Sequence, residues 1–163
     1  MNKATDINPR DLEGRTPLHS AAKEGHLEVC KMITNKVTDI DPRDHEGRTP
    51  LHAAAEEGHK EVCKFIVDKV EDKNPEDLEG RTPLHAAAEE GHLEVCKMII
   101  NKVTDINPRD HEGWTPLHAA AEEGHKEVCK FIVDKVEDKN PEDENGVTPH
   151  ELMWNSICEM EYI

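Results

Sequence analysis

The sequence predicts an all-α fold, a solenoid of stacked helix-turn-helix units, and three observations support this prediction. Thr-Pro and Gly-His each recur with a fixed step of 33 residues. The segments between these markers are near copies of one another. Only 3% of the residues are aromatic, which is too few for one large core. A fixed period of this length is typical of proteins whose repeats contact only their neighbours. The markers are Thr16, Thr49, Thr82, Thr115 and Thr148, and Gly25, Gly58, Gly91 and Gly124.

One unit of the pattern, residues 49–66 (TPLHAAAEEGHKEVCKFI), predicts two short helices. Thr49 suits an N-cap, and Pro50 suits a first helical position, where no amide hydrogen is needed. Gly58 can end the first helix in a left-handed conformation. His59 then opens a second helix with an apolar stripe. That stripe is Val62, Cys63, Phe65 and Ile66. Neither helix can bury its apolar side alone, so each unit needs a copy on either side.

The Gly-x-Thr-Pro-Leu-His motif, the Ala-Ala pair, the Gly-His and the 33-residue period together resemble the ankyrin repeat. The resemblance covers nearly the whole chain and implies a single array over residues 1–163. It also implies hairpin-like loops, or fingers, that join the units and project at right angles to the helices. The full repeats are 11–43, 44–76, 77–109 and 110–142, and 143–163 is a partial fifth.

Both ends of the array carry signs of capping. Ser20 and Thr34 put hydroxyl groups where the third repeat has Ala86 and Ile100, as expected of a terminal repeat that faces water. We therefore interpret residues 11–43 as an N-terminal capping repeat.

Residues 143–163 predict a C-terminal cap. Thr148 and Glu151 have the spacing of a capping box, in which each side chain binds the other residue's amide. Leu152, Met153 and Ile157 can cover the last face of the fourth repeat.

The units alternate, so the true period is 66 residues. The second and fourth repeats differ only at Arg48 against Trp114, whereas the first and third differ at four positions. Drift after a natural duplication would scatter such differences. This pattern favours an engineered array made by tandem copying of a two-repeat module, with a very recent natural duplication as the alternative.

The ends of the second helices depart from the ankyrin pattern. The family usually has Gly where this chain has Val37, Val70, Val103 and Val136. A β-branched residue resists positive φ. We therefore expect that Asn35 or Lys36 takes the turn instead, or that the helix runs further.

The charge of the chain is strongly negative, at −16. Nucleic acid is a poor partner for it, because affinity for nucleic acid comes mainly from Lys and Arg. Residues 1–43 are balanced, whereas residues 110–142 carry 4 basic and 9 acidic groups. This surface either only solubilises the chain or attracts a basic partner to its C-terminal half.

No apolar run approaches the roughly 20 residues of a membrane span, and the N-terminus lacks a secretory signal. We expect a cytoplasmic monomer without a membrane partner. If the chain is engineered, we expect it in the cytosol of the expression host.

Two histidine columns and one cysteine column follow the period. The resemblance implies that His19, His52, His85 and His118 join the finger and helix of neighbouring repeats. His26, His59, His92 and His125 precede Cys30, Cys63, Cys96 and Cys129 by four residues. Neighbouring helices pack too far apart for a disulfide between repeats, so we interpret the cysteines as small buried apolar residues. Two ligands are too few for a structural zinc site. Four identical copies along a rod do not assemble one catalytic centre. We expect no enzyme, cofactor or metal.

The resemblance implies that a partner would bind the concave face, which the finger tips and first helices form together. The candidate partner-binding residues are Arg15, His45, Arg48, Glu56, Glu57, Leu78, Arg81, Glu89, Glu90, His111, Trp114, Glu122 and Glu123. Trp114 is the one outlier in a nearly periodic set, and an exposed Trp is a common contact anchor. The alternatives are that Trp114 is inherited from the parent repeat or was placed as a spectroscopic probe. The glutamate pairs also fit a second interpretation, as solvated ends of the first helices. Because a dedicated binder would vary this face, the sequence favours a scaffold without a specific target. The alternative is a protein-interaction module for a basic peptide or protein.

Deleting residues 143–163 tests the C-terminal cap. We expect the truncated chain to fray or aggregate, because the apolar face of the fourth repeat would meet water. Thermal unfolding and light scattering would measure this. A truncated chain that melts like the parent and stays monomeric would show that the cap assignment is wrong.

Overall fold

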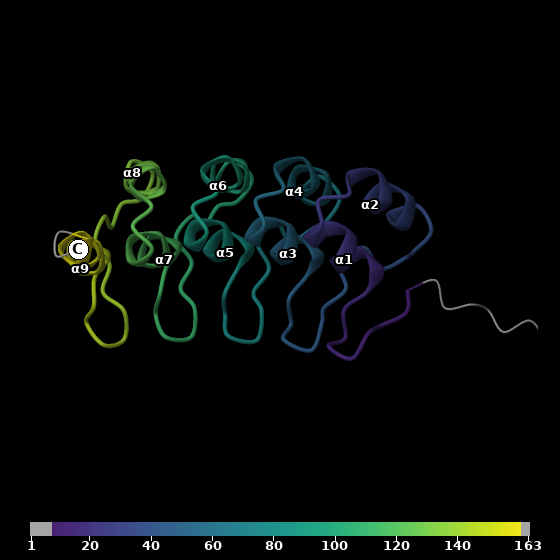
Figure 1. Ribbon diagram of the computed structural model, residues 1–163, viewed down its shortest axis with the longest axis horizontal. Helices are drawn as coiled ribbons and strands as arrows, with labels where there is room; N and C mark the ends of the chain where they lie inside the picture. Colours follow the sequence, from purple (N-terminus) through teal and green to yellow (C-terminus); the bar gives the residue numbers. More distant parts are fainter. Residues whose placement is uncertain (1–7, 161–163) are drawn as a thin grey trace, which may run out of the picture.

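The computed structural model describes the backbone of residues 8–160 and the side chains of residues 8–154. The described residues form nine α-helices and no β-strand, which confirms the predicted all-α solenoid. Figure 1 shows two rows of helices, with loops that project from the first row away from the second. The first row holds α1 (Pro17–Lys23), α3 (Pro50–Glu56), α5 (Pro83–Glu89), α7 (Pro116–Glu122) and α9 (Pro149–Met160). The second row holds α2 (Leu27–Thr34), α4 (Lys60–Val67), α6 (Leu93–Ile100) and α8 (Lys126–Val133).

The first helix of each full repeat begins at a Thr-Pro pair, as predicted. Thr49 has extended backbone, with φ −103°, and Pro50 is the first helical residue. The amide of Thr49 donates to Nδ1 of His52 at 3.1 Å, which completes a capping box with a histidine at the third helical position. The described fifth-repeat cap uses Glu151 instead, whose Oε2 accepts from the Thr148 amide at 3.0 Å. The capping box predicted there is confirmed.

The core is a thin layer of small apolar side chains between neighbouring helix pairs. Leu51, Leu84 and Leu117 are fully buried, and the alanines beside them let the first helices pack closely. At the N-terminal end this layer has no neighbour among the described residues. Val29 is 42% exposed and Met32 is 60% exposed, whereas Val62 of the next repeat is 1% exposed.

The polar substitutions in the first repeat lie where water reaches them. Ser20 is exposed and Thr34 is half-buried, while Ile100, the counterpart of Thr34, is buried. At the other end, Leu152 and Met153 pack against the core. Ile157, which we expected to share that role, lies outside the residues whose side chains are described, as does Cys158.

The first histidine column joins each repeat to the next. Nε2 of His52 lies 3.1 Å from the carbonyl oxygen of Arg81, in the following finger. Because Nδ1 of His52 accepts from the Thr49 amide, the ring is neutral and Nε2–H is the donor. His19, His85 and His118 make the same contact with the next finger. Burial lowers the pKa of His52 and of His85 to about 4.

Two members of the second histidine column, His59 and His92, join their repeat to the one before. Nε2 of His59 lies 2.8 Å from the carbonyl oxygen of Lys23, and Nε2 of His92 lies 2.9 Å from that of Glu56. The ring of His59 also covers Gly25, where a Cβ would lie 2.6 Å from Nδ1. The spacing of this column from the cysteines would suit metal ligands, but the rings of His59 and His92 bind carbonyl groups. Among the described residues, no group of three or more His, Cys, Asp or Glu side chains could hold a metal ion.

The second helices end without a left-handed residue. α2 ends at Thr34, and the amides of Lys36 and Val37 both donate to the carbonyl of Ile33, at 2.8 and 3.1 Å. Among the described residues only glycines have positive φ. Asn35 and Lys36 therefore form the turn, as one alternative expected, but with negative φ. The other alternative, a longer helix, is wrong.

The cysteines of the four full repeats are buried free thiols, as the sequence predicts. Burial raises the pKa of Cys30 and Cys129 to about 11, and that of Cys63 and Cys96 to about 12. A thiol that stays protonated is a poor nucleophile and a poor metal ligand. No helix within residues 8–160 has both the length and the apolar character needed to cross a membrane.

Acid should weaken the array through the buried histidines. The pKa of His52 and of His85 is about 4 in the folded chain and ~6.5 in an unfolded one. The unfolded state therefore binds more protons between these values, and stability falls as the pH drops through this window. From pH 7 to pH 5 we expect each histidine to lower the free energy of unfolding by roughly 2 kcal/mol. Urea unfolding at both pH values measures the change.

His85→Gln is the informative variant for this prediction, because Gln keeps one acceptor and one donor but does not titrate. The loss of stability between pH 7 and pH 5 should be smaller in this variant than in the parent. The control variant is His45→Gln, at an exposed position, which should lose as much stability between pH 7 and pH 5 as the parent does. Equal pH dependence in the parent and His85→Gln would contradict the assignment.

Candidate functional site: a groove between the fingers and the first helices

Each finger is built on an aspartate at its first position. The fingers are residues 11–15, 44–48, 77–81, 110–114 and 143–147. In the second finger, Oδ1 of Asp44 accepts from the amides of Glu46 and Arg48, at 3.0 and 2.8 Å. Asp11, Asp77, Asp110 and Asp143 repeat this pattern. The backbone of each finger also bonds to the next one, as in His45 N–H to the carbonyl of Glu13 at 2.9 Å.

Arginines before three of the fingers add a side-chain clamp. Nη1 of Arg109 donates to the carbonyl of Gly113, in the finger that follows it, at 3.0 Å. It also donates at 2.6 Å to the carbonyl of Glu142, the residue just before the next finger. Arg10 and Arg43 make the equivalent contacts. The matching position before the third finger is Glu76, and a carboxylate cannot donate. The link between the third and fourth fingers therefore lacks this clamp.

The fingers and first helices enclose three hollows that follow one another along the array. The first hollow lies between repeats one and two and includes Arg15, Lys23 and Arg48, with a volume of about 610 Å³. The second lies between repeats two and three and includes Arg48 and Arg81, with about 400 Å³. The third lies between repeats three and four and includes Arg81 and Trp114, with about 350 Å³. Together these hollows form one groove.

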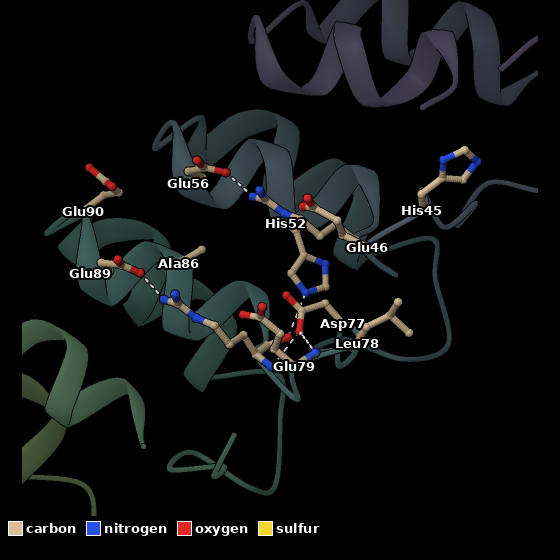
Figure 2. A pocket seen from close by; sticks show the side chains of 12 residues that line it. His45, Glu46, His52, Glu56, Asp77, Leu78, Glu79, Ala86, Glu89 and Glu90 are labelled. Carbon is tan, nitrogen blue, oxygen red and sulfur yellow. Dashed lines mark hydrogen bonds and ion pairs between the residues drawn. The ribbon is translucent and has the colours of Figure 1, made fainter. Parts of the chain in front are cut away.

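In the second hollow the finger arginines are occupied by the array's own glutamates. Nη2 of Arg48 contacts Oε2 of Glu56, and Nη2 of Arg81 contacts Oε2 of Glu89. Figure 2 shows Glu56 and Glu89 on their helices, each joined to a guanidinium group, while Glu90 points away from both pairs. At repeats two and three, the finger arginine is therefore paired with the glutamate on the first helix.

The first repeat replaces the helix glutamate with Lys23, and its finger arginine turns elsewhere. Nε of Arg15 contacts Oδ2 of Asp11 at 2.8 Å, and its Nη2 contacts Glu13. Nζ of Lys23 lies 3.8 Å from Oε1 of Glu57, a weak contact between exposed groups.

The fourth repeat reverses this substitution, because Trp114 replaces the finger arginine and Glu122 remains. Nε1 of Trp114 donates to Oδ2 of Asp143 at 3.0 Å. Its ring stacks on that of His118, with centroids 5.8 Å apart and an interplanar angle of 26°. Glu122 forms no ion pair with any side chain among residues 8–154. Burial raises its pKa, and so do the nearby carboxylates of Glu123 and Glu89.

The groove brings together most of the residues that the sequence proposed for partner binding. Glu57 and Glu123 are the exceptions, because they line none of the hollows. The groove-lining members are Arg15, His45, Arg48, Glu56, Leu78, Arg81, Glu89, Glu90, His111, Trp114 and Glu122.

Sequence reasoning missed two features of this groove. It assigned no clamping role to Arg10, Arg43 and Arg109, whose guanidinium groups bind finger carbonyls. It also missed Asp143, which holds the indole of Trp114. The sequence held a signal in both cases. The arginines before the fingers are 33 or 66 residues apart, and an aspartate starts a finger every 33 residues.

Glu76→Arg should restore the missing clamp. An arginine there would reach the carbonyls of Gly80 and Arg109 as Arg43 reaches those of Gly47 and Glu76. We expect a gain of about 1 kcal/mol in the free energy of unfolding, measured by urea unfolding at pH 7. Glu142→Arg is the matched control, because it makes the same charge change before the fifth finger, and the described residues include no sixth finger to which it could be clamped. Equal gains from both variants would attribute the effect to net charge and refute the clamp.

Comparison with known proteins agrees with this architecture. A sequence search of curated proteins found no match. The family model described as ankyrin repeats (3 copies) matches residues 1–77 and again residues 69–145. These matches span the four helix pairs, their fingers and the groove, so the chain belongs to the ankyrin repeat family.

Proposed function

We propose that the chain is a protein-interaction module whose groove binds a basic peptide or a basic segment of a protein. The observation that carries this proposal is Glu122, an exposed carboxylate on the groove without the arginine that pairs with Glu56 and Glu89. Ankyrin repeats are generally protein-interaction modules, and this family is typically non-enzymatic. The proposal adds the chemistry of the partner to that general role.

Charge supports a basic partner over an acidic one. The chain has a net charge of −16, and most of the excess of acidic groups lies in the C-terminal half. The basic residues that line the hollows fall from three in the first, to Arg48 and Arg81 in the second, to Arg81 alone in the third. A cationic partner would therefore be steered toward repeats three and four.

A scaffold without a dedicated target is the second candidate function. The near identity of the second and fourth repeats favours it, because irregular partners select irregular surfaces. We propose for either case that tandem copying of a two-repeat module by design made the array. The two candidates differ in one outcome, which is whether the groove binds a basic peptide at all.

Calorimetric titration with a peptide that alternates Arg and Ser tests the proposal. We expect saturable binding that weakens between low and high salt (about 50 and 300 mM), because exposed charges are screened. A peptide that alternates Glu and Ser should not bind. Replacing Glu122 and Glu123 with Lys should weaken binding about tenfold or more, since it reverses the charge beside the third hollow.

The charge-matched control is Glu61→Lys with Glu127→Lys, on the exposed sides of α4 and α8. It changes the net charge equally and should leave most of the affinity intact. Absence of binding by the parent would support the scaffold instead. Equal losses in both double variants would mean that only overall charge, and not the groove, attracts the peptide.

A further inference from the structure

Repeats two and four form a natural pair of variants, because only position 48 against position 114 distinguishes them. In repeat two the guanidinium of Arg48 reaches across the groove to Glu56. In repeat three Arg81 reaches Glu89 in the same way. Repeat four keeps the carboxylate, Glu122, at the same place on its first helix but has Trp114 on the finger. One half of a recurring ion pair is thus present without the other.

We infer that the third hollow is a receptor for one arginine side chain of the partner protein. That side chain would supply from outside the guanidinium that repeats two and three supply from their own fingers. This inference rests on the proposed function and deepens it, since it names the residue recognised and the place where it binds.

Trp114 is held in a fixed orientation beside this hollow. One edge of its indole donates from Nε1 to Oδ2 of Asp143 at 3.0 Å, and the ring stacks on His118. Asp143 is held in turn, because its Oδ1 accepts from the amides of Asn145 and Val147, both at 2.8 Å. An aromatic surface that is already ordered costs little conformational entropy when a partner binds.

The lining of the third hollow favours a cation over any other occupant. Its one Lys or Arg, Arg81, is already paired with Glu89. Glu79, Glu112 and Glu122 also line it. The pKa of Glu122 is raised by burial and by the neighbouring carboxylates, so a positive charge brought beside it would relieve this repulsion.

The geometry favours arginine over lysine. A guanidinium is planar, so it can stack on the indole while its edge donates two hydrogen bonds to a carboxylate. Trp is also the aromatic side chain that attracts cations most strongly. A lysine ammonium offers a point charge and cannot make both contacts in this way.

The test uses the full chain labelled with ¹⁵N, and acetyl-Gly-Arg-Gly-amide as the probe. The indole N–H signals report on Trp114 and Trp154 separately. We expect the Trp114 signal to shift saturably when this tripeptide is added. The tripeptide with Lys in place of Arg should bind more weakly, and the tripeptide with citrulline in place of Arg should cause no saturable shift. Trp114→Arg makes repeat four identical to repeat two and should weaken binding about tenfold or more, because the internal arginine then occupies Glu122.

Arg48→Trp is the reciprocal variant, since it makes repeat two identical to repeat four. We expect it to create a second binding site beside Glu56, with His52 and Asp77 in the places of His118 and Asp143. The double variant, Arg48→Trp with Trp114→Arg, keeps the net charge and moves the site. Its binding should become sensitive to Glu56→Gln and insensitive to Glu122→Gln.

Several outcomes would overturn the inference. One is an unshifted Trp114 signal, and another is equal binding by the parent and Trp114→Arg. A third is a double variant that remains sensitive to Glu122→Gln and not to Glu56→Gln. If the longer Arg-Ser peptide still binds in a way that depends on Glu122 and Glu123, these results refute the arginine receptor and leave the proposed function standing. If neither peptide binds, both fail.

Discussion

The constraint on which the structure depends is that no single repeat can bury its apolar side. A pair of helices of seven and eight residues has too little surface to close a core. The solution is lateral packing, with fully buried leucines such as Leu51 and small alanines between rows. Two histidine columns hold this stack in register from opposite directions. His52 binds the finger ahead, and His59 binds the helix behind.

The same stacking creates the groove and fixes its chemistry. In repeats two and three, the side chain at the last finger position meets the first helix of its own repeat. An arginine there meets a glutamate, as with Arg48 and Glu56. A tryptophan there instead reaches forward to Asp143 and leaves Glu122 without a cation. A single substitution in a periodic frame therefore leaves one groove carboxylate without its ion pair and does not alter the fold.

The fold could be predicted from the sequence because each helix start and stop is marked locally. Thr49 and Pro50 open a helix, and the apolar stripe of the second helix sets its buried side. The turn after α2 was harder, since Val37 excludes the usual left-handed glycine without saying what replaces it. The pairing of Arg48 with Glu56 was also missed. A separation of eight residues across a finger and a helix matches no helical or strand period, so only the three-dimensional register shows the contact.

The uncovered valine and methionine of α2 have a consequence for how the molecule could be lengthened. Val29 and Met32 present to solvent the surface that Val62 and its neighbours bury against an adjoining helix. Another 33-residue module added before the first repeat could pack its apolar side chains against Val29 and Met32. No existing hydrogen bond would have to break. Growth at this end would extend the groove by one hollow for each added module, so the number of modules would set the length of the groove.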